Sequence, residues 1–165
     1  MSVAAQIVLL LATFLCSLVA GFLFAFAVVI MPGIRNLDDG AFLRAFQEMD
    51  GVIQRGHPLF GLVWVGSVLA LVAGLGLSVG QVAGLEKMLL VLAGGVYLLG
   101  VQLPTFVINI PLNNELQTLD INGADETTRR SARERFESRW NRWNTIRTAL
   151  AALASAMLVI LLVRL

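Results

Sequence analysis

The stretch AQIVLLLATFLCSLVAGFLFAFAVVI, residues 5–30, contains no charged side chain. A helix needs roughly 20 apolar residues to cross the hydrocarbon core of a bilayer, and this stretch is longer than that. Three further apolar stretches follow at 58–79, 85–108 and 144–163, and Glu86 is the one acidic residue in any of them. The pattern predicts four membrane-spanning helices.

The composition agrees with this prediction. Hydrophobic residues make up 58% of the 165 residues and charged residues 14%, whereas a soluble domain has roughly 25% charged residues. The mean hydropathy is +0.81. Because so few charged side chains cannot cover a soluble globule, we expect an all-α, polytopic membrane protein. We expect a four-transmembrane-helix bundle that forms a single domain over residues 1–165.

The first stretch has one feature of a secretory signal peptide, because Ala25-Phe26-Ala27 has the form of a cleavage site. However, no basic residue precedes it, and its apolar run far exceeds the roughly 7–15 residues of a signal peptide. We therefore expect this helix to be retained. Cys16 is the single cysteine and lies within the helix, so no intramolecular disulfide can form.

The basic residues are unevenly distributed along the chain. Ten of the twelve lie in or next to the two long connecting segments, and Lys87 and Arg164 lie on the other side. The ten are Arg35, Arg44, Arg55, Arg129, Arg130, Arg133, Arg135, Arg139, Arg142 and Arg147. By the positive-inside rule, we expect a multi-pass protein of the cell membrane with both long loops in the cytoplasm and both termini outside.

The first long loop predicts an amphipathic helix on the cytoplasmic rim of the membrane. Met31-Pro32-Gly33 is expected to end the first span, Asp38 or Asp39 to cap the new helix, and Gly56 to end it. Its apolar face is Phe42, Phe46, Met49 and Ile53. A polar stripe beside that face is Gln47, Asp50 and Gln54, with His57 next along the chain.

The second long loop predicts a cytoplasmic extension of the fourth helix. Residues 124–165 contain neither glycine nor proline. Opposite charges four residues apart, which stabilise a helix, occur at Glu126–Arg130, Arg130–Glu134 and Arg133–Glu137. We expect one helix from near residue 125 to the C-terminus, roughly 60 Å long and so about twice the hydrocarbon thickness.

Polar residues recur at helical spacing near the cytoplasmic ends of the third and fourth spans. The stripe on the third is Gln102, Thr105, Asn109 and Asn113, provided that the helix continues through Pro104. The stripe on the fourth is Trp140, Asn144 and Arg147. Because unpaired polar groups in hydrocarbon cost several kcal/mol each, we expect both stripes to face one pocket beneath the stripe of the rim helix.

Simpler explanations exist for several of these residues. Asn113 and Asn114 fit a turn after Pro111, and Trp140 and Trp143 fit interfacial anchors.

The charged residues have simpler explanations as well. Arg147 could extend to the lipid headgroups, and His57 fits an interfacial loop. The arginine run 129–142 fits a solvated collar beside the headgroups.

The second and third spans are rich in glycine, and residues 76–80 match the small-xxx-small pattern. Small residues allow close approach of membrane helices, either within the bundle or in a homo-oligomer.

The sequence contains few residues that could bind a metal ion or a cofactor. One histidine and one cysteine exclude a bis-histidine haem, an iron–sulfur cluster and a histidine-rich copper or zinc site. No phosphate-binding glycine loop occurs. We expect no metal, no cofactor and no nucleic-acid partner. The expected partners are the lipid bilayer and a lipophilic small molecule.

Three motifs together resemble the anthrone oxygenase family of small four-helix membrane proteins. They are MPG at 31–33, NIPLN at 109–113 and WNRWNTIRT at 140–148. The family's fungal members oxidise an anthrone to an anthraquinone with molecular oxygen and no evident cofactor. The resemblance implies functional roles for Pro32, Asn109, Pro111, Asn113, Trp143, Asn144 and Arg147.

Such a reaction needs a base, a clamp for an enolate oxygen and an aromatic cleft. We expect Asp50 or His57 as the base. The expected clamp is Arg147 with Asn144 and Asn113. The expected substrate-binding residues are Asn109, Trp140, Trp143, Gln47, Gln54 and Gln102. The alternative is a non-enzymatic membrane protein that binds a lipid or quinone-like molecule or supports a partner complex.

Overall fold

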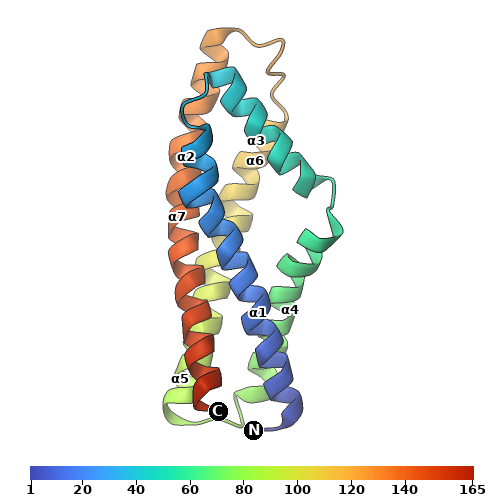
Figure 1. Cartoon of the computed structure of the whole chain (residues 1–165), viewed down its shortest axis with the longest axis vertical. Helices are drawn as coiled ribbons and strands as arrows, with labels where there is room; N and C mark the ends of the chain where they lie inside the picture. Colours follow the sequence, from blue (N-terminus) through green and yellow to red (C-terminus); the bar gives the residue numbers. More distant parts are fainter.

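The computed structural model describes all 165 residues and is entirely helical. Four helices are long and apolar enough to cross a membrane, as predicted, and they pack into one bundle (Figure 1). They span Val3–Ile34, Pro58–Ser78, Gly84–Gln117 and Glu126–Arg164. Both chain termini lie at one end of the bundle, the terminal end, and helix α3 (Asp39–Gln54) lies at the opposite end, the α3 end (Figure 1).

The first long helix consists of α1 (Val3–Ala25), a π-helical segment η1 (Phe26–Ile30) and α2 (Met31–Ile34). It continues through the Met31-Pro32-Gly33 sequence, which we expected to end it, and stops at Ile34. The π segment explains the difference. Its wider turn relieves the clash between a proline ring and the carbonyl four residues earlier.

The third long helix contains two such π-helical segments. It consists of α5 (Gly84–Gly95), η2 (Val96–Gln102), η3 (Thr105–Asn109) and α6 (Ile110–Gln117). Pro104 follows η2 and Pro111 follows η3, so each proline inside these helices comes just after a π segment. The helix therefore continues through Pro104, which is the condition for a single polar stripe along it.

The first long loop contains α3 (Asp39–Gln54), which lies across the end of the bundle opposite the chain termini (Figure 1). The carboxylate of Asp38 caps it and accepts a hydrogen bond of 2.8 Å from the backbone N–H of Ala41. The helix ends before Gly56, whose φ of +77° favours glycine. Phe42 and Phe46 are buried against neighbouring helices. Helix α4 (Pro58–Ser78) then returns along α1.

Helix α7 (Glu126–Arg164) is one unbroken helix of 39 residues, which confirms the prediction from its lack of glycine and proline. The carboxylate of Asp125 accepts a hydrogen bond from the backbone N–H of Thr128 at 2.7 Å. Two of the three predicted charge pairs form, Arg130–Glu134 and Arg133–Glu137. Arg130 pairs with the following glutamate rather than with Glu126.

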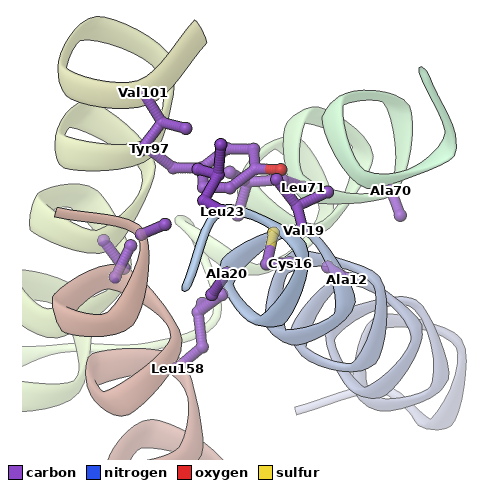
Figure 2. Packing of buried hydrophobic residues seen from close by; sticks show 13 residues of the cluster. Ala12, Cys16, Val19, Ala20, Leu23, Ala70, Leu71, Tyr97, Val101 and Leu158 are labelled. Carbon is purple, nitrogen blue, oxygen red and sulfur yellow. The ribbon is translucent and has the colours of Figure 1, made fainter. Parts of the chain in front are cut away.

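The middle of the bundle is closely packed around Cys16, Tyr97 and Leu158 (Figure 2). Glycine makes this packing possible at three positions. A Cβ atom at Gly74, Gly94 or Gly100 would lie 2.8, 2.6 or 2.7 Å from a leucine side chain of a neighbouring helix. These glycines therefore allow helices to approach one another within the bundle.

Candidate functional site

A cavity of about 420 Å³ lies inside the α3 end of the bundle. All four long helices and α3 contribute residues to its walls. The lining residues are Phe22, Leu23, Phe26, Phe46, Asp50, Ile53, Gln54, Phe60, Gly61, Trp64, Val65, Thr105, Phe106, Asn109, Ile110, Asn113, Asn114, Trp140, Asn144 and Arg147.

Aromatic side chains form one side of the cavity. Phe60 and Trp64 stack with ring centroids 5.4 Å apart and an interplanar angle of 23°. The ring of Phe22 meets that of Phe60 edge-on at 5.3 Å. Phe26 and Trp140 continue the wall, with centroids 5.6 Å apart. Flat aromatic faces of this kind suit a planar, apolar molecule.

Arg147 lies on the polar side and is only 3% exposed. Its Nη1 donates to Thr105 Oγ1 at 2.7 Å, and its Nη2 donates to Asn144 Oδ1 at 3.1 Å. The Asn144 amide nitrogen in turn donates to the backbone carbonyl of Leu23 at 3.1 Å. No carboxylate forms a salt bridge with Arg147, and its Nε has no hydrogen-bond partner. The guanidinium therefore faces the bundle interior rather than the headgroups.

Asp50 is also buried on the cavity lining, and its carboxylate is held by side-chain amides. Its Oδ1 accepts from Asn113 Nδ2 at 2.8 Å, and its Oδ2 accepts from Gln54 and Gln117 Nε2 at 2.7 and 2.9 Å. Asn113 Oδ1 accepts from Trp140 Nε1 at 2.8 Å. A continuous hydrogen-bonded chain thus joins α3, α6 and α7, and both ends of the Asn113 amide are occupied within it.

Asn109 lies on η3, about one helical turn beyond Thr105. It is 2% exposed, and neither its amide nitrogen nor its amide oxygen has a hydrogen-bond partner. A buried polar group without a partner costs about 1–3 kcal/mol. The Asn109 amide and the Arg147 Nε are thus the unsatisfied polar groups on the cavity lining. Both residues therefore carry an unpaired hydrogen-bond donor beside the cavity.

The protein-family model described as anthrone oxygenase matches residues 49–157, well over half of the chain. The chain belongs to the anthrone oxygenase family. The match begins in α3, ends in α7, and includes Asp50, Asn109, Asn113, Asn144 and Arg147. Helix α1 lies outside the matched range. Comparison with curated proteins and with solved structures gives no match.

In this anthrone oxygenase family member, seven of the residues that we expected at the site line the cavity. They are Asp50, Gln54, Asn109, Asn113, Trp140, Asn144 and Arg147. Asn113 and Asn114 lie inside α6 rather than at a turn. The three polar stripes therefore meet at one cavity.

Four of the residues that we expected at the site lie outside the cavity lining. Gln47 donates to the backbone carbonyls of Leu116 and Leu119 at 2.8 and 3.0 Å, and so joins α3 to the end of α6. Gln102 accepts a hydrogen bond from Trp64 Nε1 at 3.0 Å. Trp143 is partly buried, and His57 is exposed before α4.

Sequence reasoning missed most of the aromatic wall of this family member, and it missed Gln117. The missed aromatic residues are Phe22, Phe26, Phe46, Phe60, Trp64 and Phe106. Because lipid tails are as apolar as a protein core, a phenylalanine in a membrane span carries no signal of which way it faces. A weak signal did exist, since Phe22 and Phe26, and likewise Phe60 and Trp64, are spaced four residues apart on one helical face.

Proposed function

We propose that this protein binds a lipophilic, planar aromatic ketone in the cavity and oxidises it with molecular oxygen, as in the conversion of an anthrone to an anthraquinone. The observation that carries the proposal is the unpartnered Asn109 amide and Arg147 Nε within an aromatic-walled cavity. Flat apolar walls suit the ring system, and the two free donors suit a ketone or enolate oxygen.

The reaction needs little from the protein beyond proton transfer and charge stabilisation. Anthrone and one O₂ give anthraquinone and one water. A base removes a methylene proton, and the enolate transfers electrons to O₂ and forms a C–O bond. The resulting hydroperoxide then loses water. Fixed donors such as Arg147 and Asn109 stabilise the enolate oxygen because its negative charge develops as the proton leaves.

Asp50 is the proposed base because it is the one carboxylate on the cavity lining. Asn113 and Gln117 hold this carboxylate in place, and Asn144 holds the Arg147 guanidinium. The two asparagines expected in the clamp are thus proposed to position other groups. Asn109 takes their place as an amide donor to the ligand.

Anthrone turnover in lipid nanodiscs tests the proposal. We expect the wild-type protein to accelerate O₂ uptake and anthraquinone formation above the rate of spontaneous oxidation. Arg147→Lys should lower the rate at least about 10-fold, because lysine cannot reproduce the fork that bonds both Thr105 and Asn144. Asp50→Asn should lower it as well.

Arg142→Lys is the matched control, because Arg142 lies on the same helix but is exposed, and it should leave the rate unchanged. A wild-type protein that gives no acceleration would contradict the proposed reaction. A wild-type rate in Arg147→Lys would contradict the role of the fork.

One observation favours a second function. Asp50 already accepts three hydrogen bonds, which leaves little access for a substrate proton. The protein would then bind a quinone-like molecule without converting it. Anthraquinone would quench the fluorescence of Trp64 and Trp140, which line the cavity, while anthrone would give no protein-dependent O₂ uptake.

We further propose that the protein crosses the cell membrane four times with its α3 end in the cytoplasm. Ten of the twelve basic residues in or near the two long connecting segments support this orientation. Gly76 and Gly80 are the glycines proposed for self-association, since a Cβ atom at either position would meet open space.

A further inference from the structure

We infer that the cavity has a lateral mouth between α4 and the third long helix, through which the ligand enters from the hydrocarbon of the bilayer rather than from water. The inference deepens the proposed function and rests on it, since its ligand is a membrane-dissolved aromatic ketone. It adds a route of entry and names the residues that control the width of that route.

The mouth is identified by residues that line the cavity and are also exposed on the outside of the bundle. Val65 on α4 is 57% exposed, and Phe106 and Ile110 on the third helix are 60% and 36% exposed. Side chains of this kind lie at the boundary between the cavity and the surface. Gln54 and Asn114 meet both conditions at the α3 end, whereas Val65, Phe106 and Ile110 mark the boundary between α4 and the third helix.

Helix packing agrees with this position. Helix α4 packs along α1 and also meets α5, but it has no comparable packing against η3, α6 or α7. In Figure 1, α4 diverges from α6 as both approach the α3 end. Near the cavity, the wall between α4 and the third helix thus has little direct packing between helices, apart from the hydrogen bond from Trp64 to Gln102.

The surface around the mouth is apolar. Leu62 and Leu69 on α4, and Leu103 and Val107 on the third helix, are all exposed. Both helices are long and apolar enough to cross a membrane. An opening bordered by exposed leucine and valine side chains faces lipid tails, so the molecules that reach it are those dissolved in the bilayer.

Hydrogen bonds cross the route from the α3 end. Gln54 Nε2 donates to Asn114 Oδ1 at 3.2 Å and so connects α3 to α6. The same nitrogen donates to Asp50 Oδ2 at 2.7 Å. Entry from the aqueous rim would have to break this bridge, whereas lateral entry would not. A ligand that enters sideways presents its oxygen inward to Asn109 and Arg147.

Gly61 sets the width of the mouth. It lines the cavity on α4, one turn before Val65, and a Cβ atom built on it would meet nothing within 4 Å. A larger side chain there would extend into open space without a clash. Gly61 is therefore the position at which the route can be narrowed with the least effect on packing.

The test is the kinetics of anthraquinone binding, measured by quenching of tryptophan fluorescence. Proteoliposomes are mixed rapidly with vesicles that carry anthraquinone, under nitrogen so that no turnover occurs. We expect Gly61→Leu to slow association at least about 10-fold. Dissociation should slow in parallel, because the same opening serves both directions. Phe106→Ala should speed both.

Gly95→Leu is the control, since Gly95 lies in the third long helix, meets open space and lines no part of the cavity; this variant should bind anthraquinone at the wild-type rate. Val65→Phe narrows the mouth without replacing a glycine and should also slow binding.

Wild-type binding rates in both narrowing variants would overturn the lateral route. Acceleration by Gln54→Ala with no effect of Gly61→Leu would instead establish entry from the aqueous rim. Absence of anthraquinone binding to the wild-type protein would overturn the proposed function and this inference with it.

Discussion

Asn109 has a buried amide with no hydrogen-bond partner in the protein, an arrangement that costs free energy unless a ligand pairs with the amide. The amide of Asn113, one helical turn further along, is fully paired. Asn113 uses both ends of its amide, to Asp50 and to Trp140. At the residue scale, Asn109 is unpaired, and we propose it as a group that binds the ligand, whereas Asn113 is part of the framework.

Asn109→Leu should therefore stabilise the empty protein and weaken binding. Leucine has a similar size and removes two unsatisfied polar atoms, so we expect a gain of about 1 kcal/mol in the free energy of unfolding. Anthraquinone affinity should fall about 10-fold or more for the loss of one hydrogen bond to the ligand. Thermal unfolding in detergent and fluorescence titration measure the two effects.

Asn113→Leu provides the contrast. It leaves the Asp50 carboxylate and the Trp140 N–H each short of a partner, so the midpoint of thermal unfolding should fall. An equal loss of stability in both leucine variants would contradict the distinction between the two asparagines.

At the scale of the elements, the extension of α7 holds the turn between α2 and α3. Arg133 Nη1 donates to the Leu37 carbonyl at 2.8 Å and to Asp39 Oδ1 at 3.0 Å, and its Nη2 donates to the Arg35 carbonyl at 2.6 Å. The guanidinium carbon also lies 4.2 Å from the centroid of the Phe42 ring. One side chain thus fixes the start of α3, the helix that carries Asp50 to the cavity.

Arg133→Ala should release this turn. We expect faster amide hydrogen exchange at residues 35–41 and a loss of about 1–3 kcal/mol in stability, because several hydrogen bonds of one charged group disappear together. Arg130→Ala is the control on the same helix. Its salt bridge is solvent-exposed, and such pairs contribute about 0–1 kcal/mol. Equal exchange in the two variants would contradict the role of Arg133.

At the scale of the whole molecule, the two ends of the bundle differ in charge. The terminal end carries Lys87 and the salt bridge between Arg164 and Glu86, whereas the segments at the α3 end carry most of the arginines. This asymmetry is the basis of the proposed orientation.

Cysteine labelling of intact cells measures the orientation. An impermeant thiol reagent should label Val82→Cys, in the loop between α4 and α5, and should not label Asn36→Cys, in the turn before α3. The native Cys16 is fully buried and should give no background. Labelling of Asn36→Cys but not of Val82→Cys would indicate the opposite orientation.

The sequence predicts the helices better than it predicts the cavity walls. Charged residues mark where the spans begin and end, although Pro32, Pro104 and Pro111 lie inside long helices rather than at their ends. Regular spacing places Asn109, Asn144 and Arg147 on inward faces. The spacing does not reveal how the hydrogen bonds are shared. Asn113 donates to Asp50, and Gln47 donates to the end of α6. Each contact joins residues more than 60 positions apart, so local spacing in the sequence cannot reveal it.

The π segments have a consequence for the length of the chain. A π turn holds one more residue than the α turn that it replaces, so η3 acts as a single-residue insertion in the third helix. Removal of one residue from Thr105–Asn109 would convert this segment to an α-helix and leave the residues after it on the same faces. The side chain at the position of Asn113 would then still be directed to the cavity. The same one-residue gap within the regular α-helix of α6 would instead rotate every residue after it by about 100°.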